Sequence, residues 1–318
     1  MANNCLQTKL KNTVNNNSIE RVGELKIHVV TRGSGDSSAD KNKITLVCGV
    51  DSTIRTTNGG KFGTSFGTYN KESDTILANT TAVLYFSDGE YDIFISNKYN
   101  LLRLLLQNTD RFISNMEDYK YLNSLVILYT SNTCVGDVAN IKNLQNLGRV
   151  ALVSPNISGD ITDFAVDSSL NNSKCYGDFT NILKNASYTS LYDLNSIIDV
   201  NTGSDKEFKG DVSQASAGII LLSYTKNKRP INVTWKTTRA ASSPVIAFES
   251  VSNVNGWNFG DDLDAMLINQ AQCSYGTRPS YIAYKTINVL GNRTSASDAA
   301  VATLKGNGFI IKVNGETL

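Results

Sequence analysis

Few side chains in this sequence have the type and spacing that chemistry requires. The densest acidic cluster holds Asp261, Asp262 and Asp264. Hydrolysis of a glycosidic bond needs two carboxylates on opposite sides of a cleft, and these three lie too close together in sequence to form such a pair. Acidic residues in the first turn of a helix also stabilise the helix dipole, which explains the cluster without catalysis. We therefore expect a protein that is not an enzyme and has no cofactor.

Histidine and cysteine do not indicate a metal site. His28 is the only histidine and lies in the alternating run 24–30, where we expect a strand residue that faces solvent. No two cysteines form a Cys-x-x-Cys pair, so neither a zinc ribbon nor a thioredoxin-type site is indicated. We expect reduced and mostly buried thiols at the five cysteine positions, which are Cys5, Cys48, Cys134, Cys175 and Cys273.

Three aromatic residues in the last third of the chain are candidates for surface binding. Trp235, Trp257 and Tyr275 could stack on sugar rings, which would make a host-surface glycan the ligand. Large aromatic side chains also anchor hydrophobic cores, so a purely structural role for the two tryptophans stays open.

The most informative pattern is Gly-Asp followed by an apolar residue. It occurs four times, and the first two copies are 23 residues apart with leucines between them. Such a period predicts stacked repeats, each of which buries its apolar side only against its neighbours. We expect the glycine in a turn and the aspartate as a cap, because one aspartate per repeat offers too few oxygens for calcium. The four copies are 136–138, 159–161, 177–179 and 210–212.

The composition argues against several classes of protein. The 318 residues include 30 basic and 29 acidic side chains without a basic stripe, so we expect no nucleic-acid partner. The longest apolar run, near 101–106, is interrupted by Arg103 and is too short to cross a bilayer, so we expect no membrane partner. The N-terminus lacks the pattern of a secretory signal. We expect a protein that stays in the cytoplasm or is packaged into a particle there.

The expected fold class is α+β with three domains. Residues 1–97 read as a β-rich N-terminal domain, in which an Asp-Gly pair indicates a hairpin between strands at 81–87 and 91–96. Residues 98–211 read as a short, degenerate leucine-rich-repeat solenoid that begins with a capping helix at 99–116.

The third domain, residues 212–318, is expected to be mixed α/β. A helix at 265–271 follows the acidic cluster, and a capping box at 295–298 starts a second helix at 299–305. Strands are predicted at 218–224, 231–236, 245–251, 281–289 and 309–313.

The repeat and its flanks resemble a known group of proteins. The stretch 122–147, with Gly136-Asp137-Val138 ahead of Ile-Lys-Asn-Leu-Gln-Asn-Leu, is similar to degenerate leucine-rich repeats of Bacteroidota proteins and their phages. The opening at 5–14 and the ending at 293–306 resemble the flanks of such proteins. The resemblance points to virion proteins of crAss-like phages, of the head-fibre or tail-accessory kind.

That resemblance implies a non-enzymatic virion structural protein that acts through protein–protein surfaces. The N-terminal part would attach to the particle, and the partners would be other capsid or tail proteins. The protein would be found in the virion, after assembly in the host cytoplasm. Virion proteins often form closed rings, so we expect a homo-oligomer. The alternative is a carbohydrate- or host-surface-binding module with the repeats as its docking surface.

Overall fold

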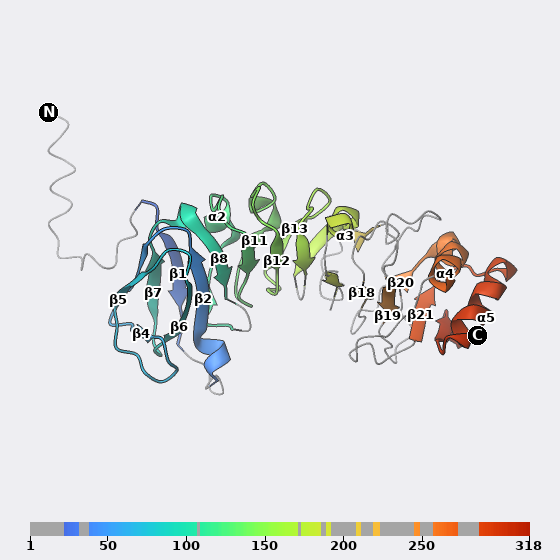
Figure 1. The fold of residues 1–318 in the computed structure, drawn as a ribbon, viewed down its shortest axis with the longest axis horizontal. Helices are drawn as coiled ribbons and strands as arrows, with labels where there is room; N and C mark the ends of the chain where they lie inside the picture. The colour runs from blue at the N-terminus through green and yellow to red at the C-terminus, as the bar shows by residue number, and fades with distance from the viewer. Residues whose placement is uncertain are drawn as a thin grey trace, which may run out of the picture.

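The chain folds mainly into β-strands with few helices, arranged in several separate sheets. Figure 1 shows these sheets following one another along the long axis. No helix in the described ranges is long and apolar enough to cross a membrane. A solenoid was not detected in these ranges either, so the repeat array stays a prediction. The computed structural model describes residues 22–31, 38–106, 109–170, 173–185, 189–191, 208–210, 219–222, 245–248, 257–272 and 286–318.

Two sheets packed face to face form the N-terminal sandwich. Its strands are β1 (Leu25–Val29), β2 (Lys43–Cys48), β3 (Ser52–Thr56), β4 (Phe62–Gly63), β5 (Ser73–Ile76), β6 (Thr81–Phe86), β7 (Tyr91–Ile95), β8 (Leu101–Leu105) and β9 (Phe112–Ile113). One sheet has the order β5-β3-β7-β1-β9, and the strands β4-β6-β2-β8 form one end of a seven-stranded sheet. Phe86 and Phe112 meet across the interface with ring centroids 5.6 Å apart. A short 3₁₀ helix, η2 (Ala39–Asn42), precedes β2.

Alternation of apolar and polar residues explains these strands. In β1, Leu25, Ile27 and Val29 are fully buried while the intervening side chains face outward. Successive side chains of a strand point to opposite faces, so this pattern places every second residue in the core. The strands predicted from the same pattern at β1, β2, β6 and β7 are confirmed.

The predicted hairpin between β6 and β7 is wrong. β6 pairs with β2, whereas β7 pairs with β1 and β3 in the other sheet. The chain therefore crosses between the sheets at 87–90. The buried Arg111 holds this crossing, since its guanidinium donates to the Ser87 carbonyl at 2.9 Å and to the Val30 carbonyl at 3.2 Å. A turn signal marks a change of direction, but the partner of each strand depends on such distant contacts.

The predicted capping helix at 99–116 is also wrong. That segment contains a 3₁₀ turn, η3 (Lys98–Asn100), then β8 and β9, and the helix α2 (Met116–Tyr119) only begins at its end. A leucine-rich run fits either a helix or a buried strand, and pairing decides the outcome here. β8 pairs with β2 on one side and with β10 (Ile127–Tyr129) on the other. The first two predicted domains consequently share one sheet.

Two ladders of parallel strands lie side by side after the sandwich. We call the described residues of 101–185, together with β17, the parallel-strand segment, so that β8 belongs both to it and to the sandwich. One ladder continues the seven-stranded sheet through β8, β10, β12 (Arg149–Ala151) and β14 (Asp167–Ser169). The other has the order β11-β13-β15-β17. The remaining elements of these ladders are β11 (Gly136–Asp137), η4 (Val138–Asn140), β13 (Ile157–Asp160), β15 (Lys174–Asp178), α3 (Thr180–Asn185) and β17 (Phe208–Lys209).

The last part of the chain has two further parallel arrangements. One is the sheet β16-β18-β19, and the other pairs β20, β21 and β22 in parallel with β23 antiparallel at the edge.

The predicted helices at 265–271 and 299–305 are confirmed as α4 and α5, although Thr294 rather than Ser295 caps the turn η8 before α5. The predicted strand at 231–236 lies outside the described residues. The elements are β16 (Thr189–Leu191), β18 (Ile219–Leu222), β19 (Val245–Phe248), β20 (Trp257–Asn258), η7 (Gly260–Asp262), α4 (Leu263–Ala271), β21 (Thr286–Leu290), η8 (Ser295–Ser297), α5 (Asp298–Gly306), β22 (Ile310–Val313) and β23 (Glu316–Thr317).

Candidate interaction surface

Four polar side chains cap successive turns of the parallel-strand segment. In each, the side-chain Oδ1 accepts a hydrogen bond from the backbone N–H two residues further on, at 2.9, 2.8, 2.9 and 2.8 Å in chain order. Such bonds satisfy donors that the first turn of a helix leaves free. The predicted capping role is confirmed for the described Gly-Asp copies, and Asp211 lies outside the described residues. The four cap residues are Asn115, Asp137, Asp160 and Asp178.

Each following glycine makes room for the cap residue of the preceding turn. A Cβ atom on Gly159 would lie 2.2 Å from Asp137 Oδ1, and one on Gly177 would lie 2.2 Å from Asp160 Oδ1. The φ angles of +127° and +106° are also ones that other residues rarely adopt. Glycine and aspartate therefore act together: the aspartate caps its own turn, and the glycine of the next copy lets it fit.

Below the caps, apolar residues three apart form the interior. Val138, Ile141, Leu144 and Leu147 are buried. The backbone N–H of each of the last three donates to the carbonyl three residues earlier, at 3.1, 3.2 and 3.1 Å. With three residues per turn, side chains at this spacing line up on one side. This side of the segment is core and is not a binding surface.

A first copy of the pattern precedes those that the sequence analysis recognised. Residues 114–116 read Ser-Asn-Met, and Asn115 caps the turn as the aspartates do. A Cβ atom on Gly136 would lie 2.9 Å from Asn115 Oδ1, so the same fit links this copy to the next. The motif Gly-Asp is lost here, but apolar residues still recur every third position from 116 to 125, as they do from 138 to 147. That spacing was the signal that could have located it.

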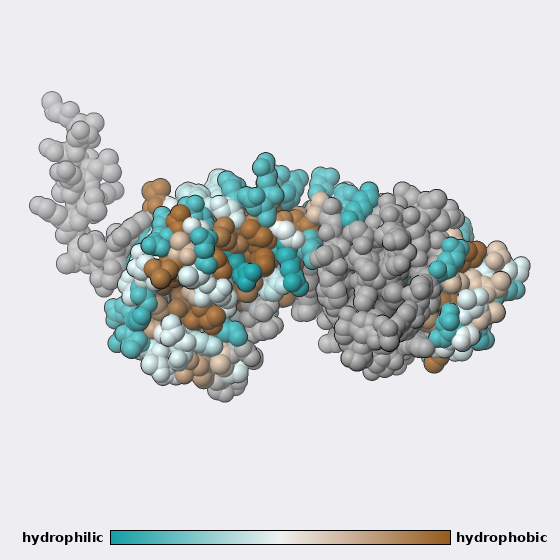
Figure 2. Space-filling view, viewed as in Figure 1, coloured by the Kyte–Doolittle hydropathy of each residue, from teal (hydrophilic) through white to brown (hydrophobic). Residues whose placement is uncertain are grey.

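In the described part of the chain, the outer face of the seven-stranded sheet is partly open. Leu105, Tyr129 and Ala151 lie in register across β8, β10 and β12 and are all half-buried. Ile127, on the neighbouring row of this face, lies in register between two arginines. Figure 2 shows apolar residues gathered around β8 to β12. We call this apolar surface with basic flanks the outer sheet face.

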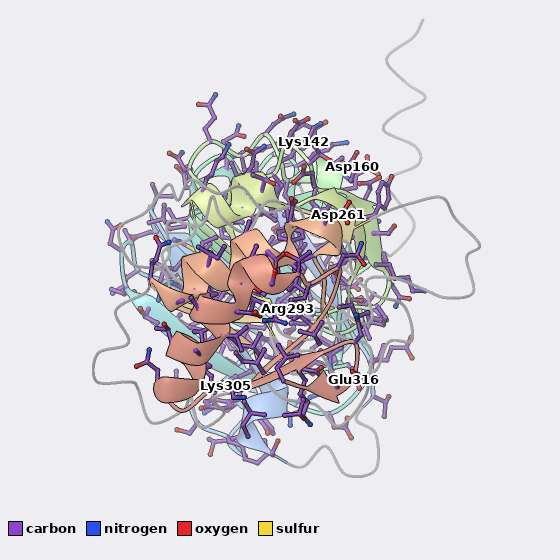
Figure 3. The ribbon with its side chains drawn as sticks, turned by 90° about the vertical axis from the view of Figure 1, so that its right-hand side faces the viewer. Lys142, Asp160, Asp261, Arg293, Lys305 and Glu316 are labelled. Carbon is purple, nitrogen blue, oxygen red and sulfur yellow. The ribbon has the colours of Figure 1, made fainter. Side chains whose placement is uncertain are left out.

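The acidic cluster at the C-terminal end is tied into the fold. The Asn292 side-chain amide donates to Asp261 at 2.6 Å, and the Thr294 backbone N–H donates to Asp264 at 3.0 Å. Burial tends to raise the pKa of Asp264, but hydrogen bonds from Ser297 and Thr294 outweigh it and lower the pKa overall. Asp261 lies beside the helices of this part in Figure 3. Among the described residues, no group of three or more His, Cys, Asp or Glu is placed to hold a metal ion.

The single histidine and the described cysteines have structural surroundings. His28 is half-exposed on β1, and its Nδ1 lies 2.9 Å from Asp92 Oδ1, in agreement with a strand residue that faces solvent. Burial raises the pKa of the Cys134 thiol to about 11 and that of Cys175 to about 12, so both stay protonated and unreactive at neutral pH. Cys48, Cys134 and Cys175 are free and buried, as predicted, while Cys5 and Cys273 lie outside the described residues.

The predicted aromatic residues are not brought together in the described part of the chain. Trp257 lies in β20, whose backbone pairs with Val289 of β21. Trp235 and Tyr275 lie outside the described residues. The aromatic side chains that do lie on a described open surface are others, such as Tyr129, whose ring centre is 5.5 Å from the guanidinium carbon of Arg149.

Comparison with known proteins found no counterpart for this chain. No protein-family model matches its sequence. No curated protein matches it, and no solved structure matches its fold.

Proposed function

We propose that this chain is a non-enzymatic structural protein of a phage particle, of the head-fibre or tail-accessory kind, that acts through protein–protein surfaces. The observation that carries the proposal is the position of β8, which pairs with β2 of the sandwich and with β10 of the parallel-strand segment. The sandwich passes into the segment through hydrogen-bonded strands, without a linker. Because the two regions are joined by paired strands, this continuity suits a structural protein that holds other proteins at a fixed distance.

The side chains of the parallel-strand segment support a structural role over a catalytic one. The aspartates Asp137, Asp160 and Asp178 accept backbone hydrogen bonds as caps. The thiols of Cys134 and Cys175 are buried with raised pKa values. Carboxylates that accept capping hydrogen bonds and thiols that stay protonated in the core are poorly suited to act as acids, bases or nucleophiles on a substrate.

We further propose that the segment is a short array of repeats of the leucine-rich kind, as the sequence resemblance implies. The recurring caps, the glycines that make room for them and the apolar residues three apart support this assignment. Each repeat would bury its apolar side against its neighbours, and the sandwich would cover the first one. The outer sheet face would then be the surface that contacts other virion proteins, because it combines apolar side chains with flanking arginines.

Incorporation into purified particles tests this function. We expect Ile127→Glu, which places a charge on the outer sheet face, to fold but to reduce the copy number of the chain per particle at least several-fold. Asn143→Glu is the matched control, since Asn143 is an exposed turn residue outside β8, β10 and β12, and its copy number should equal that of the wild type. Quantitative mass spectrometry of particles gives both values.

Two results would contradict the proposal. Wild-type copy numbers for Ile127→Glu would remove the outer sheet face as the contact surface. Absence of the wild-type chain from purified particles, or depolymerisation of capsular polysaccharide by the purified chain, would remove the structural function itself. Specific hits on a glycan array would favour the carbohydrate-binding alternative instead.

A further inference from the structure

Asparagine followed by glycine is a chemically weak pair, and it recurs along this chain. The backbone nitrogen of the glycine can attack the side-chain amide of the asparagine, because glycine has no Cβ atom to hinder the approach. Asparagine accordingly counts among the thermolabile residue types. The pairs in the described chain are Asn58-Gly59, Asn307-Gly308 and Asn314-Gly315, while a further pair at 255–256 lies outside the described residues.

Two of these pairs are held by hydrogen bonds that the reaction would have to break. The Asn314 side-chain amide donates to the Gly291 carbonyl at 3.0 Å and accepts from the Gly291 N–H at 3.1 Å. These bonds keep the amide carbon from turning towards the Gly315 nitrogen. At the other pair the attacking group itself is engaged, since the Gly308 N–H donates to the Lys305 carbonyl at 2.9 Å. The fold therefore protects both pairs.

The pair at Asn58 has neither restraint. Within the described chain, no hydrogen bond involves the Asn58 side chain or the Gly59 N–H. Both residues are exposed, and nothing lies within 4 Å of a Cβ atom placed on Gly59. The attacking nitrogen, the amide carbon and solvent water therefore have free access to one another.

The turn that carries this pair is fixed at its ends and free in its middle. The Gly60 N–H donates to the Thr57 carbonyl at 2.8 Å, and the φ angles of +50° and +73° at positions 58 and 59 are those of a type I′ turn. Gly60 also packs against the Tyr91 ring, where a Cβ atom would not fit. Types I′ and II′ differ in the orientation of the central peptide. The Gly59 nitrogen can therefore turn towards the side chain without opening the turn.

We propose that Asn58 is a site of spontaneous deamidation, while Asn307 and Asn314 are protected by the fold. The Gly59 nitrogen forms a bond to Cγ of Asn58 as the bond from Cγ to Nδ2 breaks, and ammonia leaves with the proton that the nitrogen loses. Water then opens the resulting succinimide ring. Cleavage of the bond between the nitrogen and Cγ gives aspartate, and cleavage of its bond to the backbone carbonyl carbon gives isoaspartate.

The two products change the turn differently. Aspartate leaves the main chain as it was, and like asparagine it tolerates a positive φ angle. Isoaspartate adds a methylene group to the main chain, which breaks the geometry of the turn closed by Gly60 and Thr57. Either product adds one negative charge and takes the formal net charge of the chain from +1 to 0. Zero net charge favours association and precipitation.

Incubation of the folded full-length chain at mildly alkaline pH tests the proposal. Mass spectrometry of peptides prepared in acid gives the deamidated fraction at each pair, and electron-transfer fragmentation separates isoaspartate from aspartate. We expect deamidation at Asn58 to be many-fold faster than at Asn307 or Asn314. In guanidinium chloride the three rates should become similar, because the protecting hydrogen bonds are gone. Similar rates in the folded chain, or a slower reaction at Asn58 than at either other pair, would overturn the proposal.

Two variants provide an independent readout. Gly59→Ala hinders the attacking nitrogen, so deamidation at Asn58 should fall several-fold while its circular dichroism melting curve shows a folded chain. Asn58→Asp has the charge of the products, so the species that accumulates in the aged wild type should elute with it on ion exchange. Unchanged deamidation in Gly59→Ala, or an aged wild type without such a species, would contradict the proposal.

Discussion

The N-terminal sandwich and the parallel-strand segment are stabilised in different ways. The sandwich buries charged groups that join distant parts of the chain, such as Arg111 and the pair of Arg55 with Glu24. From residue 114 to residue 182, the buried polar side chains that the structure describes are only Ser and Thr. The segment relies instead on a local arrangement that recurs, in which a cap fits a glycine of the next copy. Damage to the sandwich should therefore spread, while damage to the segment should stay local.

The largest expected effect comes from breaking a buried ion pair of the sandwich. Arg55 donates to both carboxylate oxygens of Glu24, at 3.1 and 2.6 Å, and its guanidinium carbon lies 4.0 Å from the centre of the Phe94 ring. Arg55→Met removes the positive charge and the two hydrogen bonds that Arg55 gives the buried carboxylate of Glu24, and we expect a loss of about 3–5 kcal/mol in unfolding free energy. Urea denaturation measures it.

The double variant Glu24→Leu with Arg55→Met is the matched control. Replacing both charges by apolar groups also removes the buried negative charge of Glu24, so most of the stability should return. A double variant as unstable as Arg55→Met alone would show that the effect arises from lost packing on Phe94 and not from the charge.

The second prediction concerns the fit between cap and glycine. Gly159→Ala places a Cβ atom 2.2 Å from Asp137 Oδ1 at a φ of +127°, and we expect about 3 kcal/mol of local destabilisation. Gly59→Ala is the control, because its φ of +73° is also positive but nothing lies within 4 Å of the added atom. Its cost should be about 1 kcal/mol. Equal losses in the two variants would mean that backbone strain alone accounts for the glycine.

A smaller effect is expected from removing a cap. Asp137→Ala deletes the acceptor for the Ala139 N–H and should cost about 1 kcal/mol. Asp137→Asn should cost much less, because Asn115 already performs this role at the first copy. Thermal unfolding of the three proteins side by side makes the comparison. An asparagine variant as unstable as the alanine variant would point to the negative charge as the stabilising feature.

The smallest expected effect is a pH dependence at the C-terminal end. The pKa of Asp264 is lower in the folded chain than its ordinary value, so its ionised form stabilises the fold. This contribution is present above the ordinary aspartate pKa of about 3.9 and is lost as the pH falls through the lower folded pKa. The protection factors of α4 and α5, which correct for the slower intrinsic exchange in acid, should therefore fall as the pH is lowered from about 4 through the folded pKa of Asp264, and Asp264→Asn should weaken that change. An identical profile for the variant would assign the dependence to another group.

The strands and helices with a regular pattern could be predicted from the sequence, whereas their partners could not. The alternation in β1 and β2 and the apolar faces of α4 and α5 depend on neighbouring residues alone. The placement of β6 and β7 in different sheets depends on contacts such as that of Arg111 with Ser87, which are distant in sequence. For 99–116, the leucine spacing did not distinguish a helix from a strand that is buried by pairing on both sides.

The candidate surface was predictable only in part. The role of the aspartates followed from the chemistry of Asp beside Gly, and the structure adds that each glycine accommodates the cap of the preceding turn. The first copy could not be recognised from the Gly-Asp motif, because Ser114 and Asn115 replace Gly and Asp there. The outer sheet face could not be predicted, since it is assembled from strands whose register only the structure gives.

Hydrogen exchange of Gly159→Ala tests the central difference between the two regions most directly. We expect protection to fall in β12, β13 and β15, next to the substitution, while β1, β2, β6 and β7 keep wild-type exchange rates. A uniform rise in exchange across both regions would contradict it, because the sandwich would then depend on the segment as much as the segment depends on the sandwich.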